Sequence, residues 1–240
     1  MVQNNTAPIG IIGAMKSEMD RIKATVEDQK ITRIGGTDYV EGKIHGVPVV
    51  VATCGIGKVF AGICAQTMIL KFHPAMIVNV GVAGSLSRDL NIGDIAVAAS
   101  VVQHDMDTSG IGDPPGLISG INMIWIPSDP DMVAGMEKSA EAAGFHRVTG
   151  AIASGDLFVT DGEKKKSIAR SFQAIACEME GGAIGQTCHV NGVPFCVLRA
   201  ISDNGDENAT DDYGMSLDMA ADRASQVLDG WLKAIGDNLR

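Results

Sequence analysis

The most apolar strand-like segment of the chain covers residues 193–203, reads VPFCVLRAISD, and ends in Asp203. An unbroken apolar run of this kind is typical of a strand that is buried on both faces. Two other apolar runs also lead into acidic stretches, which contain Glu18 and the pair Glu178 and Glu180. In an alternating α/β sheet, the loops at the carboxyl ends of the strands converge on the ligand crevice. We therefore expect these carboxylates to meet there and to act on a polar small molecule.

Strand-like and helix-like segments alternate along the whole chain, which predicts one α/β domain around a large sheet. The expected strands cover residues 9–12, 47–52, 75–80, 92–102, 148–153, 173–177 and 193–201. The expected helices begin at Ser17, Lys58, Pro130, Glu163, Gly181 and Ser216. Residues 1–8 are expected to form a flexible tail, and residues 9–240 to form the single domain.

The composition excludes several classes of partner. The net charge of the 240 residues is -10, which argues against nucleic acid or an anionic membrane because both require basic patches. No apolar run approaches the length of a membrane span, and the N-terminus has no signal-peptide pattern. The five cysteines are odd in number and lie in apolar contexts without CxxC spacing. We expect buried free thiols and a cytoplasmic protein.

Two short motifs resemble phosphate-binding, dinucleotide-binding or metal-binding motifs, but their residue spacing does not match. The glycines of CGIGK at residues 54–58 lack the spacing of a phosphate-binding loop and the third glycine of a dinucleotide-binding turn. His104 and Asp105 have no second ligand cluster, so we expect no metal site. Any one of the three acidic positions alone would more often be structural, as a helix-dipole or turn residue. Their recurrence after apolar runs favours a catalytic interpretation.

Several motifs occur in an order that resembles the 5′-methylthioadenosine/S-adenosylhomocysteine nucleosidase family, within the purine nucleoside phosphorylase superfamily. They are GIIGAM at residues 10–15 with Glu18, GIGKV at 55–59, NVGVAG at 79–84, SGDLF at 154–158, EME at 178–180 and RAISD at 199–203. The resemblance covers the chain from Ile9 to about the last helix. It implies a three-layer α/β/α sandwich with a central mixed sheet, and hydrolysis without a metal or cofactor.

The resemblance also implies a role for each acidic residue in breaking the bond between adenine and ribose. Asp203 would protonate N7 of the leaving base, which requires a raised pKa in a desolvated pocket. Glu18 would orient and deprotonate the attacking water, and its position at a helix N-terminus should keep it ionised. Glu180 would accept hydrogen bonds from the ribose hydroxyls and offset the positive charge that develops on the sugar.

The other residues that the resemblance implies bind the nucleoside substrate. Phe158 would stack on adenine, the backbone of Val159 would read the edge of the base, Met179 would pack on the sugar, and Arg199 would contact the ribose or the nucleophile. The set is completed by Met15, Ile56, Val82, Ala83, Gly84 and Glu178. The family is usually homodimeric, and a loop of the partner subunit completes the 5′-thio pocket. Ile111, in the expected long loop 104–121, is the matching apolar residue.

Three alternative functions remain open at this point, and two positions depart from the family pattern. A purine nucleoside phosphorylase would use phosphate, which the charge of Glu18 would repel. Some related enzymes cleave aminodeoxyfutalosine, and a non-catalytic nucleoside-binding protein would not require the intact acidic set. Val82 also stands where many family members have serine or threonine. The acidic segment 204–214 could be a mobile lid that brings Tyr213 or Leu217 over the 5′ group, or a solvated loop without that role.

Overall fold

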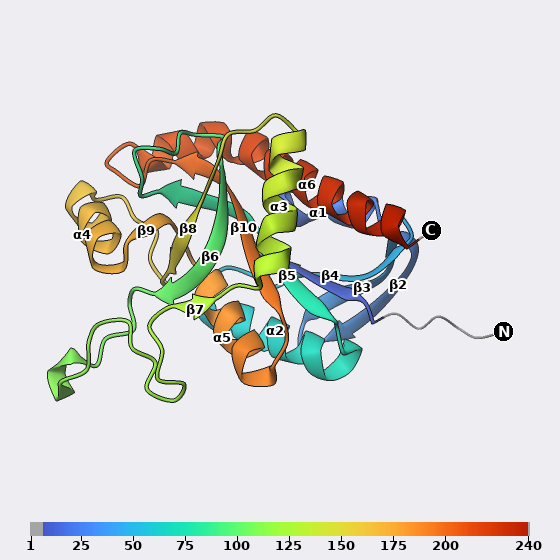
Figure 1. Cartoon of the computed structure of the whole chain (residues 1–240), viewed down its shortest axis with the longest axis horizontal. Coiled ribbons are helices and arrows are strands. Elements are labelled where there is room, and N and C mark those ends of the chain that lie inside the picture. Colours follow the sequence, from blue (N-terminus) through green and yellow to red (C-terminus); the bar gives the residue numbers. More distant parts are fainter. Residues whose placement is uncertain (1–6, 240) are drawn as a thin grey trace.

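The computed structural model describes residues 7–239, which form a ten-stranded mixed sheet with helices packed around it (Figure 1). The strands are β1 (Ile9–Gly13), β2 (Glu27–Ile34), β3 (Thr37–Ile44), β4 (Val47–Thr53), β5 (Met76–Ser85), β6 (Ile95–Gln103), β7 (Ile126–Pro127), β8 (Arg147–Ser154), β9 (Ala174–Glu178) and β10 (Phe195–Asp203). The helices are α1 (Lys16–Ala24), α2 (Lys58–Phe72), α3 (Pro130–Ala142), α4 (Gly162–Phe172), α5 (Gly181–Asn191) and α6 (Ala209–Asn238), with a 3-10 turn η1 (Ser109–Ile111).

The sheet closes on itself at one side. Its strand order is β10-β6-β8-β9-β5-β1-β4-β3-β2, and β10 also pairs with β5. The strands β5, β10, β6, β8 and β9 therefore form a ring, and β1 to β4 extend from it as an open sheet. Every residue of β1 and β10 is buried, as expected for unbroken apolar runs in the interior of a sheet.

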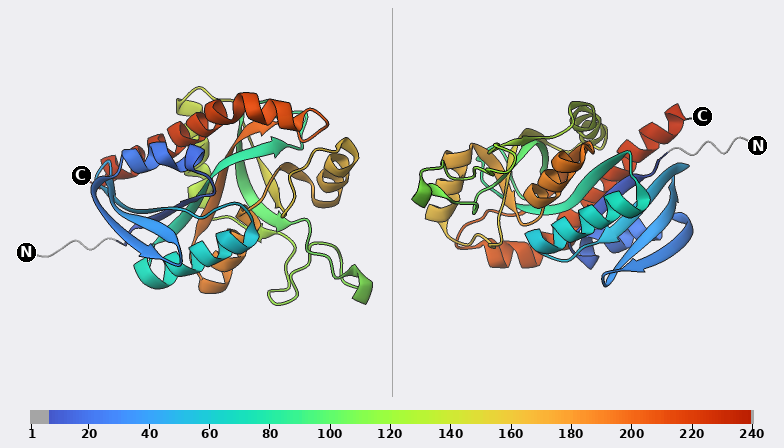
Figure 2. Two further views of the ribbon diagram at one scale, coloured as in Figure 1. Left: turned by 180° about the vertical axis from the view of Figure 1, so that it is seen from behind. Right: turned by 90° about the horizontal axis from the view of Figure 1, so that it is seen from below.

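Helices cover both faces of the sheet, which confirms the expected three-layer architecture. One core cluster packs α1, α3 and α6 against the sheet, with Met19, Met136 and Leu228 among its members. A second cluster packs α2 and α5 against the opposite face, with Met68 and Ile184 among its members. The two views of Figure 2 show these helix layers on either side of the strands. The shorter helix α4 packs in a third, smaller cluster beside the ring.

Two segments of the fold were not expected from the sequence. Strands β2 and β3 form an antiparallel hairpin at the sheet edge, joined at Gly35 and Gly36, which adopt positive φ values of 58° and 84°. Half of the residues of β2 are charged and most are exposed, so no apolar run marks the strand. The expected tail over residues 1–8 lies outside the described residues except for Ala7 and Pro8, whose carbonyl accepts a hydrogen bond from Ala75.

Two expected helix starts were wrong. Helix α1 is capped by Met15 rather than Ser17, because Glu18 reaches back to the backbone at its start. Helix α6 begins at Ala209 rather than at Ser216, and Asp211 and Asp212 in its first turn complement the helix dipole. The expected loop 204–214 is therefore a short turn over residues 204–208 followed by helix.

The described cysteines and helices agree with the composition. All five cysteines are free and buried, which confirms that expectation. Across residues 7–239, no helix combines the length and the apolar character needed to cross a bilayer.

Candidate functional site

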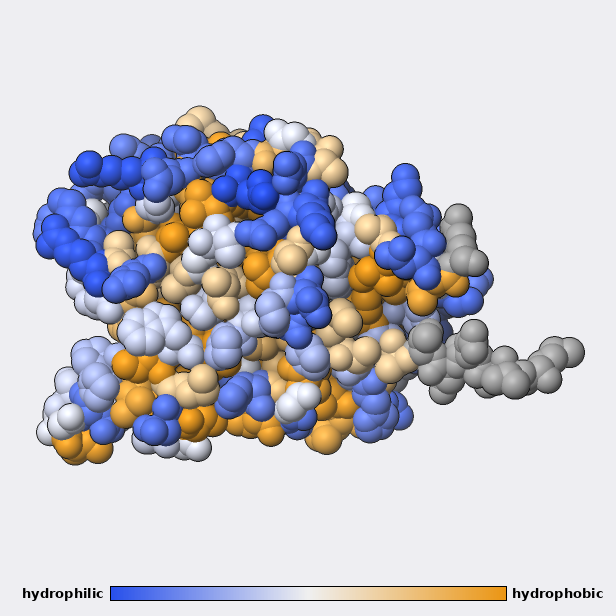
Figure 3. All heavy atoms as spheres, in the orientation of Figure 1, coloured by the Kyte–Doolittle hydropathy of each residue, from blue (hydrophilic) through white to orange (hydrophobic). Residues whose placement is uncertain are grey.

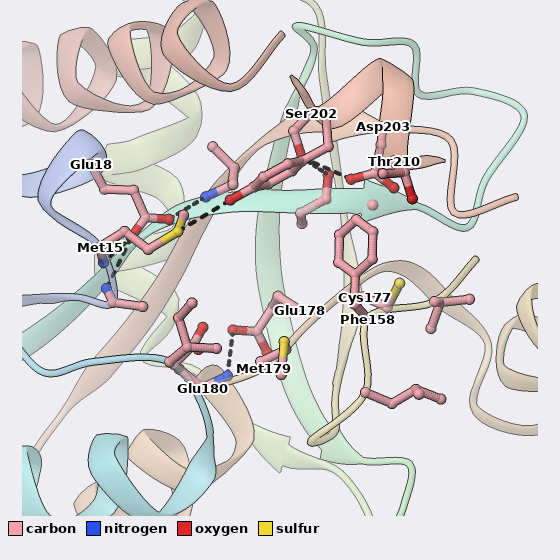
Figure 4. A pocket seen from close by; sticks show the side chains of 18 residues that line it. Met15, Glu18, Phe158, Cys177, Glu178, Met179, Glu180, Ser202, Asp203 and Thr210 are labelled. Atoms are coloured by element: carbon pink, nitrogen blue, oxygen red, sulfur yellow. Dashed lines mark hydrogen bonds between the residues drawn. The ribbon is translucent and has the colours of Figure 1, made fainter. Parts of the chain in front are cut away.

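A cavity of about 400 Å³ lies where the ends of β1, β5, β9 and β10 meet (Figure 4). It is lined by Ala14, Met15, Glu18, Ile56, Val82, Ala83, Gly84, Leu157, Phe158, Val159, Cys177, Glu178, Met179, Glu180, Ser202, Asp203, Thr210 and Tyr213. The structure thus brings together all the residues expected in the site except Arg199 and Ile111. None of the lining residues is Lys, Arg or His, so the polar part of the wall is dominated by carboxylates.

The strands deliver these groups from two directions. β1 and β10 are both parallel to β5, so Met15, Val82 and Asp203 arrive at the same edge. β9 is antiparallel to β5, with Cys177 opposite Gly84, and brings Glu178 from the other direction. The sequence argument, which assumed that every acidic stretch followed a strand of one orientation, did not anticipate this. The mixed pairing makes the carboxylates face one another across the cavity.

Glu18 lies at the start of α1 with only 5% of its surface exposed. One carboxylate oxygen accepts hydrogen bonds from the backbone N–H of Ala14 and Met15 at 2.9 and 2.8 Å, and the other from Val82 at 3.1 Å. Burial raises the pKa of Glu18, while the charge of Arg199 and these three N–H donors act in the opposite direction. The helix start orients the carboxylate, and burial makes it a stronger base than an exposed glutamate.

Asp203 ends β10 on the far side of the cavity from Glu18 (Figure 4). Its carboxyl accepts hydrogen bonds from the backbone N–H of Gly205 and the hydroxyl of Ser202, both at 2.9 Å. Burial raises the pKa of Asp203, and the charges of Asp212 and Asp206 act in the same direction against those two donors. The group is therefore suited to hold a proton at a pH where an exposed aspartate would have lost it.

Gly84 allows the close approach of Asp203 to β5. A Cβ atom at this position would lie 2.7 Å from a carboxyl oxygen of Asp203 and 3.4 Å from the sulfur of Cys177. Real Cβ atoms do not tolerate the first distance, so any side chain here would displace the carboxyl. The last glycine of the NVGVAG motif thus serves the site by its lack of a side chain.

Arg199 lies behind the cavity wall, with 1% of its surface exposed. Its guanidinium donates to Glu178 and, at 2.5 Å, to the side-chain oxygen of Asn79, and lies 3.7 Å from Glu180. Glu178 also accepts hydrogen bonds from Ser154 and from the backbone N–H of Gly181. The ion pair between Arg199 and Glu178 thus joins β10 to β9 behind the cavity, while the Nε atom of Arg199 is buried without a hydrogen-bond partner among residues 7–239.

Glu180 lines the cavity between the two other acidic groups. One of its oxygens accepts a hydrogen bond from the backbone N–H of Gly57 at 2.9 Å, which ties β9 to the glycine loop before α2. Burial, together with the charge of Glu178, raises the pKa of Glu180, and Arg199 opposes this. Its other oxygen, 3.7 Å from Arg199, contributes to the polar floor.

An apolar group lies at the mouth of the cavity. Phe158 and Tyr213 meet edge to face with ring centroids 5.5 Å apart, and the Tyr213 hydroxyl contacts the Met15 sulfur at 3.2 Å. Of the two residues considered for this place, Tyr213 lines the cavity and Leu217 does not. Tyr213 and Thr210 lie one turn apart on the first part of α6. Thr210 was missed, and the choice between Tyr213 and Leu217 stayed open, because the helix was expected to start later.

Ile111 lies outside its own subunit's cavity, on the 3-10 turn η1, with 84% of its surface exposed. The sequence also missed Ala14, Leu157, Cys177 and Ser202, each of which adjoins a motif residue that was expected in the site. Within residues 7–239, no group of three or more His, Cys, Asp or Glu residues is arranged to hold a metal ion.

Comparisons with known proteins give a consistent result. The sequence model described as the phosphorylase superfamily matches residues 8–233. The chain is 36% identical over 229 residues to a 5′-methylthioadenosine/S-adenosylhomocysteine nucleosidase of Shewanella halifaxensis (strain HAW-EB4), which covers 95% of this chain and 99% of the relative.

Solved structures have the same fold. The enzyme of the same name from Neisseria meningitidis, in complex with methylthio-immucillin-A, superposes with a TM-score of 0.92 at 31% identity, over 95% of this chain and 100% of that one. The native futalosine hydrolase of Helicobacter pylori strain 26695 superposes with a TM-score of 0.90 at 36% identity, over 95% of this chain and 97% of that one.

The raised pKa of Asp203 predicts how stability depends on pH. Its contribution to stability is fully present below the ordinary value of 3.8 and is lost as the pH rises through the raised folded-state pKa, because the fold accommodates the protonated form best. Asp203→Asn cannot ionise, so its thermal midpoint should exceed that of the unmodified protein at neutral pH. The difference should close as the pH falls toward 3.8.

The matched control is Asp218→Asn, which removes an exposed carboxylate on α6 and should leave the midpoint unchanged. Thermal melts followed by circular dichroism at a fixed protein concentration measure both variants. Equal midpoints for Asp203→Asn and the unmodified protein at neutral pH would contradict the electrostatic description of the site.

Proposed function

The chain belongs to the 5′-methylthioadenosine/S-adenosylhomocysteine nucleosidase family within the phosphorylase superfamily, and from this premise we propose how its cavity works. The reaction is hydrolysis of the N-glycosidic bond of 5′-methylthioadenosine and S-adenosylhomocysteine, which releases adenine and the thioribose. The observation that carries the mechanism is the position of two buried carboxylates, Glu18 and Asp203, on opposite sides of one cavity.

Asp203 is the general acid. As the bond between ribose and adenine breaks, negative charge develops on the base, and the carboxyl of Asp203 donates its proton to N7. Its raised pKa supports this role, because a general acid must still be protonated at the working pH. The Ser202 hydroxyl and the Gly205 N–H hold the carboxyl in place and stabilise the carboxylate that remains.

Glu18 and Glu180 act on the sugar side. Glu18 orients a water molecule and takes its proton as the oxygen attacks the anomeric carbon, with burial making it the stronger base. Glu180 accepts hydrogen bonds from the ribose hydroxyls and stabilises the positive charge of the oxocarbenium-like transition state. Arg199 and Glu178 act from behind, fixing the backbone that presents Glu180.

The charge of the cavity favours water over phosphate as the nucleophile. A phosphorylase must hold a phosphate anion beside the anomeric carbon, which requires cationic or hydroxyl groups there. In this cavity that side is occupied by Glu18, and no lining residue is cationic. Bringing a phosphate dianion next to a buried carboxylate would cost several kcal/mol.

The apolar walls bind the two ends of the substrate. Phe158 stacks on adenine, and the backbone of Val159 reads the edge of the base. Met179 packs on the sugar, while Met15, Ile56 and Tyr213 surround the 5′-thio substituent. Val82 offers only its backbone and an apolar side chain near the ribose, so recognition of the hydroxyls depends on Glu180.

A homodimer with the partner's Ile111 in the 5′-thio pocket is the assembly that we infer. Four exposed apolar side chains follow one face of α2: Val59, Phe60, Ile63 and Leu70. Figure 3 shows apolar side chains along the lower edge, where α2 and α5 lie in Figure 1. The patch continues into Ile56 at the cavity, so a second subunit seated there would cover the open side of the site.

The cytoplasm is the proposed compartment, because five buried free thiols suit a reducing environment. The adenine and thioribose products also suit a role in methionine salvage.

We predict that the protein releases adenine and a free thioribose from methylthioadenosine without phosphate and in the presence of a chelator. Chromatography of the products distinguishes the thioribose from a thioribose 1-phosphate. A requirement for phosphate or a metal ion would contradict the mechanism. Parallel rates on S-adenosylhomocysteine and aminodeoxyfutalosine establish the order of preference, since the three substrates share adenine and differ at the 5′ substituent.

Loss of either proton-transfer group should lower kcat more than it changes KM. Asp203→Asn and Glu18→Gln keep the shape of the pocket but remove the acid and the base, so each should lower kcat about a hundredfold or more. Steady-state kinetics with methylthioadenosine measures the effect, with Asp218→Asn as the control. Turnover near the unmodified rate in both variants would refute the assignment of acid and base.

Sedimentation at micromolar concentration should show a dimer. Ile63→Asp places a charge in the apolar face of α2 and should produce monomers, whereas Ile31→Asp on the exposed edge strand β2 should not. Ile111→Ala should leave the dimer intact and raise KM for methylthioadenosine about tenfold, because apolar contact area in the 5′ pocket is lost. A monomeric unmodified protein, or a full-affinity Ile111→Ala variant, would count against this assembly.

A further inference from the structure

The turn that follows β10 determines how Asp203 is held. Gly205, two residues later, has a positive φ of 59° and donates its N–H to the Asp203 carboxyl at 2.9 Å. The turn also lies against the end of β5, since a Cβ atom at Gly205 would be in van der Waals contact with the carbonyl oxygen of Ser85, at 3.4 Å. The direction of the Asp203 carboxyl therefore depends on the shape of residues 204–208.

Helix α4 holds this turn from outside the cavity. The Lys165 ammonium donates a hydrogen bond to the carbonyl oxygen of Asn204 at 2.5 Å. The N–H of Gly162, at the start of the same helix, donates to Glu207 at 3.3 Å. On the opposite side of the turn, the amide of Asn204 donates to Asp212 of α6 at 3.0 Å. Hydrogen bonds to α4 and to α6 thus hold the turn over residues 204–208.

Lys165 is distinguished from its neighbours by this contact. The sequence has three consecutive lysines at residues 164–166, and Lys164 and Lys166 are exposed. Lys166 makes only a surface ion pair with Glu163 at 2.7 Å, which contributes little to stability. Lys165 is half-buried, and its bond crosses to a segment 39 residues later in the chain.

The helix itself is anchored to the pocket wall. Ile168 and Phe172, on the buried face of α4, belong to the same apolar cluster as Val159 and Cys177, which line the cavity. A lysine on a helix fixed in this way has a defined position. Its ammonium therefore links the position of the cavity wall to the turn that follows Asp203.

We propose that Lys165 is a positioning residue for Asp203, acting through the carbonyl of Asn204 to hold the turn whose Gly205 N–H orients the carboxyl. Lys165 does not line the cavity and touches no substrate. This inference rests on the proposed role of Asp203 as the general acid. A displacement of a reacting group by about 1 Å can cost up to about a hundredfold in rate, so a bond remote from the substrate can matter to turnover.

The test is a double-mutant cycle between Lys165 and Asp203. Lys165→Met removes the donor while keeping the length of the side chain, and should lower kcat about tenfold with KM changed less than about twofold. In the Asp203→Asn background the same substitution should have no further effect on kcat, because there is no acid left to position. Lys165→Arg, which retains a donor, should recover most of the lost turnover.

Lys164→Met and Lys166→Met are the matched controls and should turn over at the unmodified rate, since neither side chain reaches the turn. If Lys165→Met does not fold, Lys165→Gln replaces it in the same cycle. A Lys165 variant at the unmodified rate, or an equal fall of kcat in both backgrounds, would overturn the proposal. Failure of the acid assignment is distinguishable, because Asp203→Asn alone would then retain near-normal turnover.

Discussion

The site depends on one buried cation surrounded by carboxylates. Arg199 is almost fully enclosed, and Glu178, Glu180 and Glu18 all act on its charge. A buried ion pair is costly to desolvate and stabilises only when its remaining polar groups are also satisfied. Here Glu178 meets that requirement, because Ser154, Arg199 and two backbone N–H groups saturate its oxygens. Arg199 thereby compensates acidic groups that could not otherwise be placed so close together.

The charge of Arg199 does not fully offset the burial of the carboxyl groups that face the cavity. Burial raises the pKa of Glu18, Glu180 and Asp203 despite the hydrogen bonds that each receives. At Asp203 the charges of Asp212 and Asp206 add to the effect of burial, and the hydrogen bonds from Ser202 and Gly205 oppose it. At Glu18 the charge of Arg199 opposes the effect of burial, so neighbouring charges act in opposite directions on the base and on the acid of the mechanism.

Apolar runs followed by acidic motifs predicted an α/β fold and the meeting of Glu18, Glu180 and Asp203. The three layers and the other expected cavity residues came from the resemblance of the motifs to the nucleosidase family. The sequence did not predict the β2–β3 hairpin, whose charged residues form an exposed edge. It could not predict that β9 is antiparallel to β5, since strand direction depends on long-range pairing that no local pattern records. The early start of α6 was missed because Asp211 and Asp212 suggested a loop rather than a first helical turn. That error left Thr210 out of the expected site and left the choice between Tyr213 and Leu217 open.

The closed ring of strands has a consequence for how the chain is synthesised. Arg199 of β10 bonds to Asn79 of β5, 120 residues earlier, and β10 is also the strand that joins β5 to β6. A nascent chain that has not yet released β10 from the ribosome leaves one edge of β5 and one edge of β6 without partners. Such apolar edges invite pairing with other chains, and contacts of this sequence separation form slowly. The unpaired edges of β5 and β6 therefore expose the chain to aggregation late in translation. This exposure ends when β10 pairs with both strands.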